Sequence, residues 1–227
     1  MHAAHAQFQP FETTPVRVSQ APTVFIVDQD PEVRRALEVL VRSAGWRVEV
    51  FTSAEEFLAR PRALSHGCLL LDIALPQLDG LDLQEIIAER SETPVIFVTS
   101  QRDVQLTVRA MKAGAVDFLT KPFNGNSIIS AIRCALDQSQ HALEEEAAMR
   151  GLRNRYVSLT PRERQVLALV VSGLLNKQVA AQLEISEITV KAHRGSAMRK
   201  MAADSLAALV RMATKLRLNA DDRTLAS

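Results

Sequence analysis

The alternation of short apolar runs with amphipathic stretches between Thr23 and Leu136 constrains the fold of this chain more than any other feature. Short apolar runs are typical of buried strands, and the stretches between them have the spacing of amphipathic helices. Strands that alternate with helices in this way form a parallel sheet with helices on its faces. The strands are predicted at Thr23–Val27, Val48–Phe51, Cys68–Leu71, Val95–Val98 and Asp117–Leu119.

Helices are predicted between these strands and after the last one. The whole segment therefore contains five strands and five helices, an α/β unit of flavodoxin-like (βα)5 type. Asp30-Pro31 supports the start of the first helix, because an aspartate N-cap and a first-turn proline both favour a helix N-terminus. The helices are predicted at Glu32–Ser43, Glu55–Ala59, Leu81–Ala88, Val104–Ala113 and Ser127–Leu136.

A second, all-α pattern follows a polar segment. From Gln138 to Arg155 the composition fits a connector, either helical or flexible. Beyond it the apolar spacing is helical throughout, and a very short turn between two of the helices is typical of a helix-turn-helix. These helices are predicted at Pro161–Ser172, Asn176–Leu183, Glu187–Met201 and Ser205–Leu216.

The two patterns divide the chain into an α/β domain and a smaller all-α domain. The expected boundaries are a disordered N-terminal tail over residues 1–22, an α/β domain over 23–137, a linker over 138–157, a four-helix domain over 158–217 and a C-terminal tail over 218–227. Charge follows the same division. The segment from Arg153 to Arg217 has twelve Lys or Arg against four acids, a net charge of +8, whereas the rest of the chain is −7. The basic part is therefore expected to meet a polyanion.

Composition excludes several other classes of protein. The longest apolar runs stop far short of the roughly 20 residues that a membrane-spanning helix needs, so no membrane association is expected. Cys68 and Cys134 are too few for a disulfide scaffold and are not spaced for zinc. The five histidines are scattered, which argues against a transition-metal cluster. Reduced thiols in a cytoplasmic protein are the expectation.

Side chains suited to phosphate and metal chemistry follow the carboxyl ends of four predicted strands. Asp28 and Asp72 come after the first and third, and Thr99 and Lys121 after the fourth and fifth. Because the carboxyl ends of parallel strands meet at one edge of the sheet, these side chains are expected to gather there. Carboxylates bind a hard cation such as Mg²⁺, and Lys and Thr pair with phosphate oxygens. The edge is therefore predicted to bind Mg²⁺ and a phosphoryl group, which the carboxylate of Asp72 can accept.

The residues around this edge resemble the receiver domain of two-component response regulators. The motifs are Asp72-Ile73-Ala74-Leu75-Pro76, Gly80, Thr99-Ser100, Met111-Lys112-Ala113-Gly114-Ala115 and Lys121-Pro122-Phe123. The resemblance implies that Asp72 accepts phosphate from a sensor histidine kinase, that Lys121 contacts the phosphoryl group, and that Thr99 and Phe118 form the switch pair. It also implies that the peptide bond before Pro122 is cis.

The resemblance also implies a set of Mg²⁺ ligands, with one departure. The set would be Asp28, Asp72, the backbone carbonyl of Ala74 and the residue after Asp28. That residue is normally a second acid, but here it is Gln29, so one negative charge is missing and the affinity for Mg²⁺ should fall. Asp30, which stands before Pro31, is expected to cap a helix rather than bind the cation.

The basic segment from Leu159 to Leu216 resembles the LuxR-type DNA-binding domain. The motifs are Leu159-Thr160-Pro161-Arg162-Glu163, Asn176-Lys177-Gln178-Val179-Ala180 and Ile188-Thr189-Val190-Lys191-Ala192-His193-Arg194. A receiver followed by this domain is the FixJ/NarL arrangement. The implied partners are double-stranded DNA, a second copy of the phosphorylated chain in a homodimer, and RNA polymerase. In the turn at Glu184 the family often has glycine, so a left-handed residue there would cost about 1 kcal/mol.

The helix predicted at Glu187–Met201 has two different faces. Val190, Ala197 and Met201 recur on one face and are expected to pack inward. The opposite face is small and cationic, which suits the major groove, and comprises Lys191, Ala192, Gly195, Ser196 and Arg199.

The residues of this helix and the preceding one can be assigned to bases or phosphates. Lys191 and Ala192 are candidates for contacts to base edges, because the first turns of a recognition helix reach them. Phosphate contacts are expected from Asn176, Lys177, Thr189, Arg194 and Arg199.

Three functions remain open at this point. The first is a transcription factor controlled by phosphorylation of Asp72. The second keeps DNA binding but has a degenerate, phosphorylation-independent receiver that acts as an interaction module, for which Gln29 is the sequence support. The third is a phosphatase with an aspartyl intermediate, which is disfavoured because Ala74 stands where a second acid would be needed. We expect a regulator rather than an enzyme.

Overall fold

The structure is a computed structural model that describes residues 21–60, 66–75, 93–100 and 104–217. The helix predicted at Leu81–Ala88, residues 1–20 of the N-terminal tail and the C-terminal tail lie outside these ranges. The chain forms two compact units, Met1–Ser139 and Gln140–Ser227. In the part of the chain that the structure describes, no helix combines the length and the apolar character needed to cross a bilayer.

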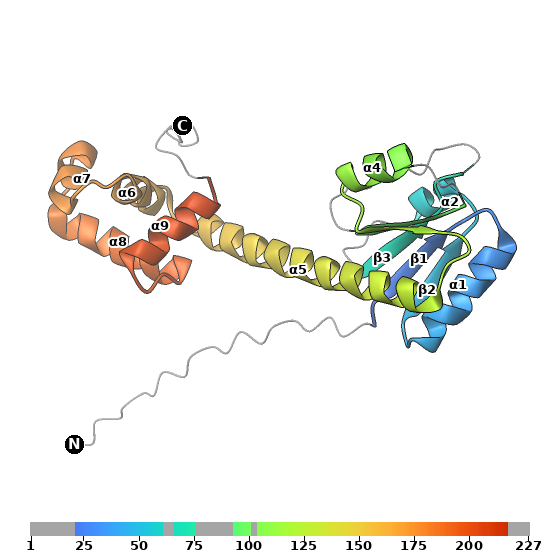
Figure 1. Cartoon of the computed structure of the whole chain (residues 1–227). Coiled ribbons are helices and arrows are strands. Elements are labelled where there is room, and N and C mark those ends of the chain that lie inside the picture. Colours follow the sequence, from blue (N-terminus) through green and yellow to red (C-terminus); the bar gives the residue numbers. More distant parts are fainter. Residues whose placement is uncertain (1–20, 61–65, 76–92, 101–103, 218–227) are drawn as a thin grey trace, which may run out of the picture. The chain divides into compact units, whose positions relative to one another are not determined.

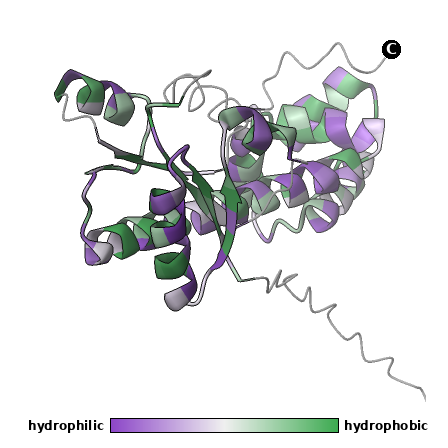
Figure 2. Cartoon of the chain, turned by 90° about the vertical axis from the view of Figure 1, so that its right-hand side faces the viewer, coloured by the Kyte–Doolittle hydropathy of each residue, from purple (hydrophilic) through white to green (hydrophobic). Residues whose placement is uncertain are grey.

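The first unit contains a parallel sheet of five strands in the order β2-β1-β3-β4-β5 (Figure 1). Every pairing between neighbours is parallel. The three inner strands β1, β3 and β4 are buried along their whole length, and the centre of the sheet is hydrophobic (Figure 2), as expected for a parallel sheet with helices on both faces. The predicted α/β class is confirmed. The strands are β1 (Thr23–Val27), β2 (Arg47–Phe51), β3 (Gly67–Leu71), β4 (Val95–Thr99) and β5 (Asp117–Thr120).

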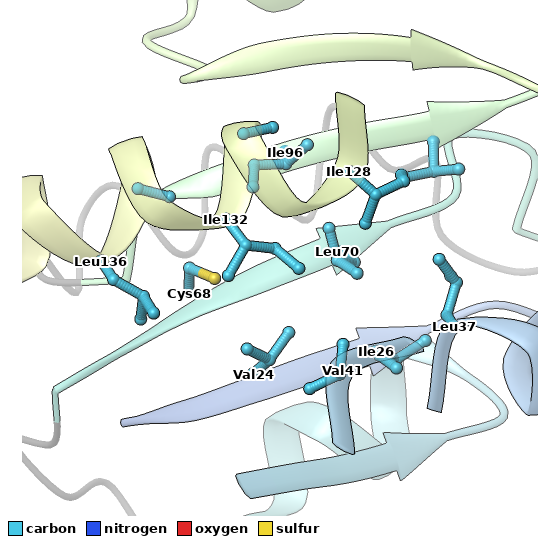
Figure 3. Packing of buried hydrophobic residues seen from close by; sticks show 13 residues of the cluster. Val24, Ile26, Leu37, Val41, Cys68, Leu70, Ile96, Ile128, Ile132 and Leu136 are labelled. Carbon is cyan, nitrogen blue, oxygen red and sulfur yellow. The ribbon is translucent and has the colours of Figure 1, made fainter. Parts of the chain in front are cut away.

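The helices of this unit cover the sheet in two layers. Alternate side chains of each strand point to opposite faces, so the sheet supports two separate cores. One core packs against α1 (Pro31–Ser43) and the first part of α5 (Gly125–Val157), where Ile128 and Ile132 meet Leu70 and Ile96 (Figure 3). The other packs against α2 (Ala54–Ala59) and α4 (Val104–Lys112).

Helix α5 is much longer than predicted. The sequence predicted its end near Leu136, but the helix continues without a break for 33 residues to Val157. The segment 138–155 is therefore helical, which decides between the two conformations considered for it. Its composition explains the continuation, since it lacks proline and has helix-supporting pairs four residues apart, such as Glu146 with Arg150 at 2.8 Å.

As far as residue 217, the second unit packs four further helices against the end of α5. Leu152 and Met149 of α5 join a core with Leu167, Met201 and Leu209. A second cluster, around Val166, Val179 and Val190, fixes the pair of helices joined by the short turn. The helices are α6 (Pro161–Val171), α7 (Asn176–Leu183), α8 (Glu187–Met201) and α9 (Leu206–Lys215).

The turn between α7 and α8 has a left-handed backbone at Glu184, the conformation considered for this position from the sequence. This residue has φ 52° and ψ 44°, and its backbone N–H donates to the carbonyl of Ala180. A side chain in this conformation costs about 1 kcal/mol relative to glycine. Ser186 then caps α8 by accepting the N–H of Thr189 at 3.1 Å. The turn therefore sets the direction in which α8 leaves it.

Glu163 ties the start of α6 to α8. Its carboxylate accepts hydrogen bonds from the N–H of Thr160 at 2.8 Å, from the Ser196 hydroxyl at 2.6 Å and from the Lys200 ammonium at 2.7 Å. The first contact is half of a capping box, in which the N–H of Glu163 donates to the Thr160 hydroxyl at 3.2 Å. Hydrogen bonds from Lys200 and Ser196 lower the pKa of Glu163 to about 2. The ionised carboxylate therefore stabilises the position of α8.

We predict that Glu163→Gln lowers the free energy of unfolding of the second unit by about 2 kcal/mol at neutral pH, because it weakens charge-assisted hydrogen bonds. Since the folded pKa lies below that of the unfolded chain, the contribution is complete above pH 4.5 and disappears as the pH falls towards about 2. Chemical denaturation of both proteins between pH 7 and pH 3, followed by circular dichroism, measures the difference. Glu145→Gln, which removes a charge from the exposed part of α5, is the control. A Glu163→Gln effect that does not shrink at acid pH would contradict this account.

Candidate functional site

Two carboxylates lie side by side at the carboxyl edge of the sheet. Asp28 directly follows β1 and Asp72 directly follows β3, and the neighbouring strands end in register at Val27 and Leu71. The N–H of Asp72 donates to the carbonyl of Val27 at 2.9 Å, which extends the pairing by one residue. Asp28 is 1% exposed and Asp72 is 6% exposed. Charges so deeply buried require partners in the protein.

Lys121 supplies the partner for both carboxylates. Its Nζ donates to Oδ2 of Asp28 at 2.6 Å and to Oδ2 of Asp72 at 2.8 Å. Lys121 follows β5, and its own N–H donates to the carbonyl of Thr99 at 2.8 Å, which anchors it beside the end of β4. The peptide bond between Lys121 and Pro122 is cis, as the family resemblance implied.

The second oxygen of each carboxylate accepts a backbone N–H. Oδ1 of Asp28 accepts from Asp30 at 2.8 Å, and Oδ1 of Asp72 accepts from Ala74 at 3.1 Å. Both carboxylates are therefore held in fixed orientations. The guanidinium of Arg34 also donates to the backbone carbonyl of Asp28 at 2.6 Å, a contact that nothing in the sequence pattern indicated.

The titration of these groups reflects burial and their mutual contacts. Burial raises the pKa of Asp28 above its ordinary value, against the opposing hydrogen bonds from Lys121 and from the N–H of Asp30. For Lys121, burial lowers the pKa, but the hydrogen bonds and charges of Asp28 and Asp72 outweigh it, so that the pKa is raised overall. Lys121 is consequently a cation over the physiological range, and it can interact with an anion at this edge.

Thr99 and Phe118 lie on β4 and β5, the two strands that follow β3 in the order of the sheet. Thr99 is the last residue of β4 and is fully buried, and it pairs in register with Thr120 of β5. Phe118 lies within β5 and is half-buried, with its ring centroid 6.4 Å from that of Phe97. The structure thus places Thr99 at the same edge as Lys121, and Phe118 within β5, three residues before Lys121.

Gln29 contacts the loop that follows β3. Its side-chain amide Nε2 donates to the carbonyl of Ala74 at 3.1 Å, so two of the four predicted cation ligands contact each other directly. Asp30 accepts the N–H groups of Glu32 and Val33 and caps α1, as predicted. Asp30, the acid that follows Gln29 in the sequence, therefore caps a helix. The position beside the Ala74 carbonyl is occupied by Gln29.

The oxygen atoms at this edge are of the type that Mg²⁺ prefers. Within the described ranges no group of three or more His, Cys, Asp or Glu side chains converges. A cation at the edge would therefore rely on Asp28, Asp72 and the Ala74 carbonyl, with water completing its coordination. These residues fit a hard, strongly hydrated cation.

The predicted DNA-contacting residues lie on α7 and α8. Val190, Ala197 and Met201 of α8 are buried, as predicted, and the opposite face is open. Ser196 was predicted on the open face, but its hydroxyl instead donates to Glu163, because its position on the helix faces α6. The candidates Lys177, Lys191, Ala192 and Arg199 are exposed, whereas Asn176, Thr189, Arg194 and Gly195 are partly buried.

Some of the partly buried candidates interact with each other or with the helix cap. Arg194 donates to Oδ1 of Asn176 at a long 3.4 Å, which links α8 to the first residue of α7. The Thr189 hydroxyl lies 2.8 Å from the hydroxyl of Ser186. These contacts link Asn176, the first residue of α7, to α8 and hold the Thr189 hydroxyl beside the N-cap of α8.

Comparison with known proteins matches both units. The model of the response regulator receiver domain matches residues 24–133, and that of the LuxR family of bacterial regulatory proteins matches residues 157–213. The response regulator protein TmoT of Ectopseudomonas mendocina is 45% identical over 199 residues, which cover 87% of this chain and 90% of TmoT. The transcriptional regulatory protein FixJ of Bradyrhizobium diazoefficiens is 40% identical over 193 residues, covering 85% and 94% of the two chains.

A solved structure shares the same architecture. The low-resolution structure of the response regulator StyR is 44% identical and has a TM-score of 0.76, and the match covers 86% of this chain and all of that one. The two predicted resemblances are confirmed by these matches.

Proposed function

Because the chain belongs to the response regulators that join a receiver domain to a LuxR-type DNA-binding domain, we propose that phosphorylation of Asp72 controls its binding to DNA. The observation that carries the proposal is the ammonium of Lys121, which lies within 2.8 Å of both Asp28 and Asp72. A cation so placed can neutralise charge on a phosphoryl group attached to its neighbour.

The transfer that we propose is a single displacement at phosphorus. An oxygen of the Asp72 carboxylate attacks the phosphohistidine of a sensor histidine kinase, the new O–P bond forms as the N–P bond breaks, and the imidazole nitrogen leaves. The N–H of Ala74 holds Oδ1 of Asp72 during this step, and Lys121 holds Oδ2. Both contacts fix the orientation of this buried nucleophile.

Mg²⁺ is the cofactor that the oxygen atoms of this edge fit. We propose that Asp28, Asp72 and the Ala74 carbonyl hold it, where it would offset the negative charge of the transferred group. The Gln29 amide already donates to the Ala74 carbonyl, so a cation has to compete with this hydrogen bond. Weak Mg²⁺ binding is therefore part of the proposal.

The phosphorylated receiver has to pass its state to the rest of the chain. A phosphoryl group adds close to two negative charges beside Lys121 and Thr99, and we propose that Thr99 moves towards it while Phe118 repacks against β4. The adjoining helix α4 exposes Val104, Val108 and Met111 at 77%, 46% and 45%. This apolar side of α4 is where we propose that two phosphorylated chains dimerise.

The dimer would then bind DNA through α7 and α8. We assign Lys191 and Ala192 to base edges, and Asn176, Lys177, Thr189, Arg194, Gly195 and Arg199 to the backbone of the duplex. The spacing of the two half-sites follows from the symmetry of the dimer. RNA polymerase is the protein partner that we propose for the DNA-bound form.

We predict that a small phosphodonor with Mg²⁺ converts the wild type to a dimer and strengthens DNA binding about tenfold or more, because two domains then bind together. Asp72→Asn should show neither response, since an amide cannot accept the phosphoryl group. Analytical ultracentrifugation and fluorescence anisotropy with a labelled duplex measure the two quantities. Asp137→Asn, an exposed acid on α5, is the matched control and should behave as wild type. Equal DNA binding by all three proteins with and without donor would contradict phosphorylation control and favour a degenerate receiver.

We predict that Gln29→Asp strengthens Mg²⁺ binding about tenfold, because it adds a carboxylate beside the Ala74 carbonyl and removes the amide N–H that competes for that carbonyl. Isothermal titration calorimetry of the full chain gives the dissociation constant. Gln29→Ala separates the two effects, since it removes the hydrogen bond without adding charge. A dissociation constant that Gln29→Asp leaves unchanged would show that residue 29 does not contact the cation.

A further inference from the structure

Ile188 is the most exposed large hydrophobic side chain in the part of the chain that the structure describes. It is 80% exposed and lies in the first turn of α8, immediately after the N-cap Ser186 and Glu187. The core contacts of this helix come from its other face, through Val190, Ala197 and Met201. Packing within the second unit therefore gives no reason for an isoleucine at this position.

Ile188 lies on the same face of α8 as the residues assigned to DNA. Lys191, Ala192 and Gly195 follow it by three, four and seven positions, and Arg199 by eleven, which is the spacing of one helix face. Lys191, Ala192 and Arg199 are exposed, and no ion pair within the described ranges involves Lys191 or Arg199. Ile188 is thus the single large apolar group on a small, cationic face.

The surroundings of Ile188 favour DNA over a protein partner. A docking site for another protein normally gathers several apolar side chains, whereas the neighbours of Ile188 on its own face are charged or small. At Gly195 an added Cβ would meet only the Arg199 guanidinium, at 3.7 Å, so the face is flat beyond Lys191. A flat cationic helix face with one apolar group near its N-terminus fits the major groove.

We propose that Ile188 reads the 5-methyl group of a thymine in the major groove. The methyl group is the apolar feature that the bases present there, and residues at the start of a recognition helix reach base edges. Lys191, one turn further along the same face, would contact the acceptor atoms of a guanine close to that thymine. The proposal rests on the proposed DNA binding by α8 and adds a residue that determines sequence preference.

The test removes the methyl group without changing base pairing. The preferred duplex is first selected from random sequences with the full-length protein and a phosphodonor, and each thymine is then replaced singly by deoxyuridine. We expect one thymine in each half-site at which the replacement weakens wild-type binding about three- to fivefold, the effect of one lost methyl contact. Ile188→Ser should bind the thymine and deoxyuridine duplexes equally. Because Ile188 is exposed, this variant should keep the circular dichroism spectrum of the wild type.

Leu175→Ser is the matched control, since Leu175 is also an exposed apolar residue, at 71%, but precedes α7. This variant should keep the wild-type sensitivity to deoxyuridine. The proposal is overturned if the wild type tolerates deoxyuridine at every position, or if Ile188→Ser keeps the wild-type sensitivity while its affinity falls equally for all duplexes. The second result would mean that Ile188 contacts the DNA backbone or a protein. Failure to select any sequence would overturn the proposed DNA binding itself. That outcome is distinguishable from the two results that would overturn only the role of Ile188.

Discussion

The ammonium of Lys121 between two buried carboxylates is the interaction on which the receiver's chemistry depends. It joins the ends of β1, β3 and β5, strands that are not all neighbours in the sheet, and brings Asp28 and Asp72 towards a common cation. Two carboxylates this deeply buried would repel each other without it, and burial already raises the pKa of Asp28. A phosphoryl group on Asp72 would therefore change the charge balance around the ammonium that links these three strand ends.

In the second unit, a comparable buried carboxylate has a structural task. Glu163 accepts hydrogen bonds from Thr160, Ser196 and Lys200, so it caps α6 and fixes α8 at once. The contrast between the two sites is informative. The contacts of Glu163 are made within one set of packed helices, whereas Asp72 lies at an edge where its partner, Lys121, can also contact an incoming phosphoryl group. Both acids are buried, so burial alone would not have distinguished the structural role of Glu163 from the functional role proposed for Asp72.

The sequence predicted much of the fold and of the candidate site, for physical reasons that particular residues show. Asp28, Asp72, Thr99 and Lys121 each come at the end of an apolar run. These positions were enough to predict that the four side chains gather, because the carboxyl ends of parallel strands must share one edge. Helices α7 and α8 were predicted to the residue, since Ser186 and the turn at Glu184 mark their boundary.

Other features depended on contacts that a pattern does not contain. The continuation of α5 past Leu136 follows from local helix propensity, which polar composition alone cannot separate from a flexible connector. Ser196 was assigned to the wrong face because its hydrogen bond to Glu163 joins residues 33 positions apart. The contact of Gln29 with Ala74 spans 45 positions and was likewise outside the reach of periodicity.

The most direct test of the central claim is to locate the phosphoryl group. The full-length protein is treated with a small phosphodonor and Mg²⁺, its intact mass is measured, and the acyl phosphate is trapped with hydroxylamine for peptide mapping. The account predicts a single phosphoryl group per chain, trapped as a hydroxamate at Asp72, and a greatly reduced yield in Lys121→Ala. A phosphoryl group at another residue, or none at any Mg²⁺ concentration, would contradict it.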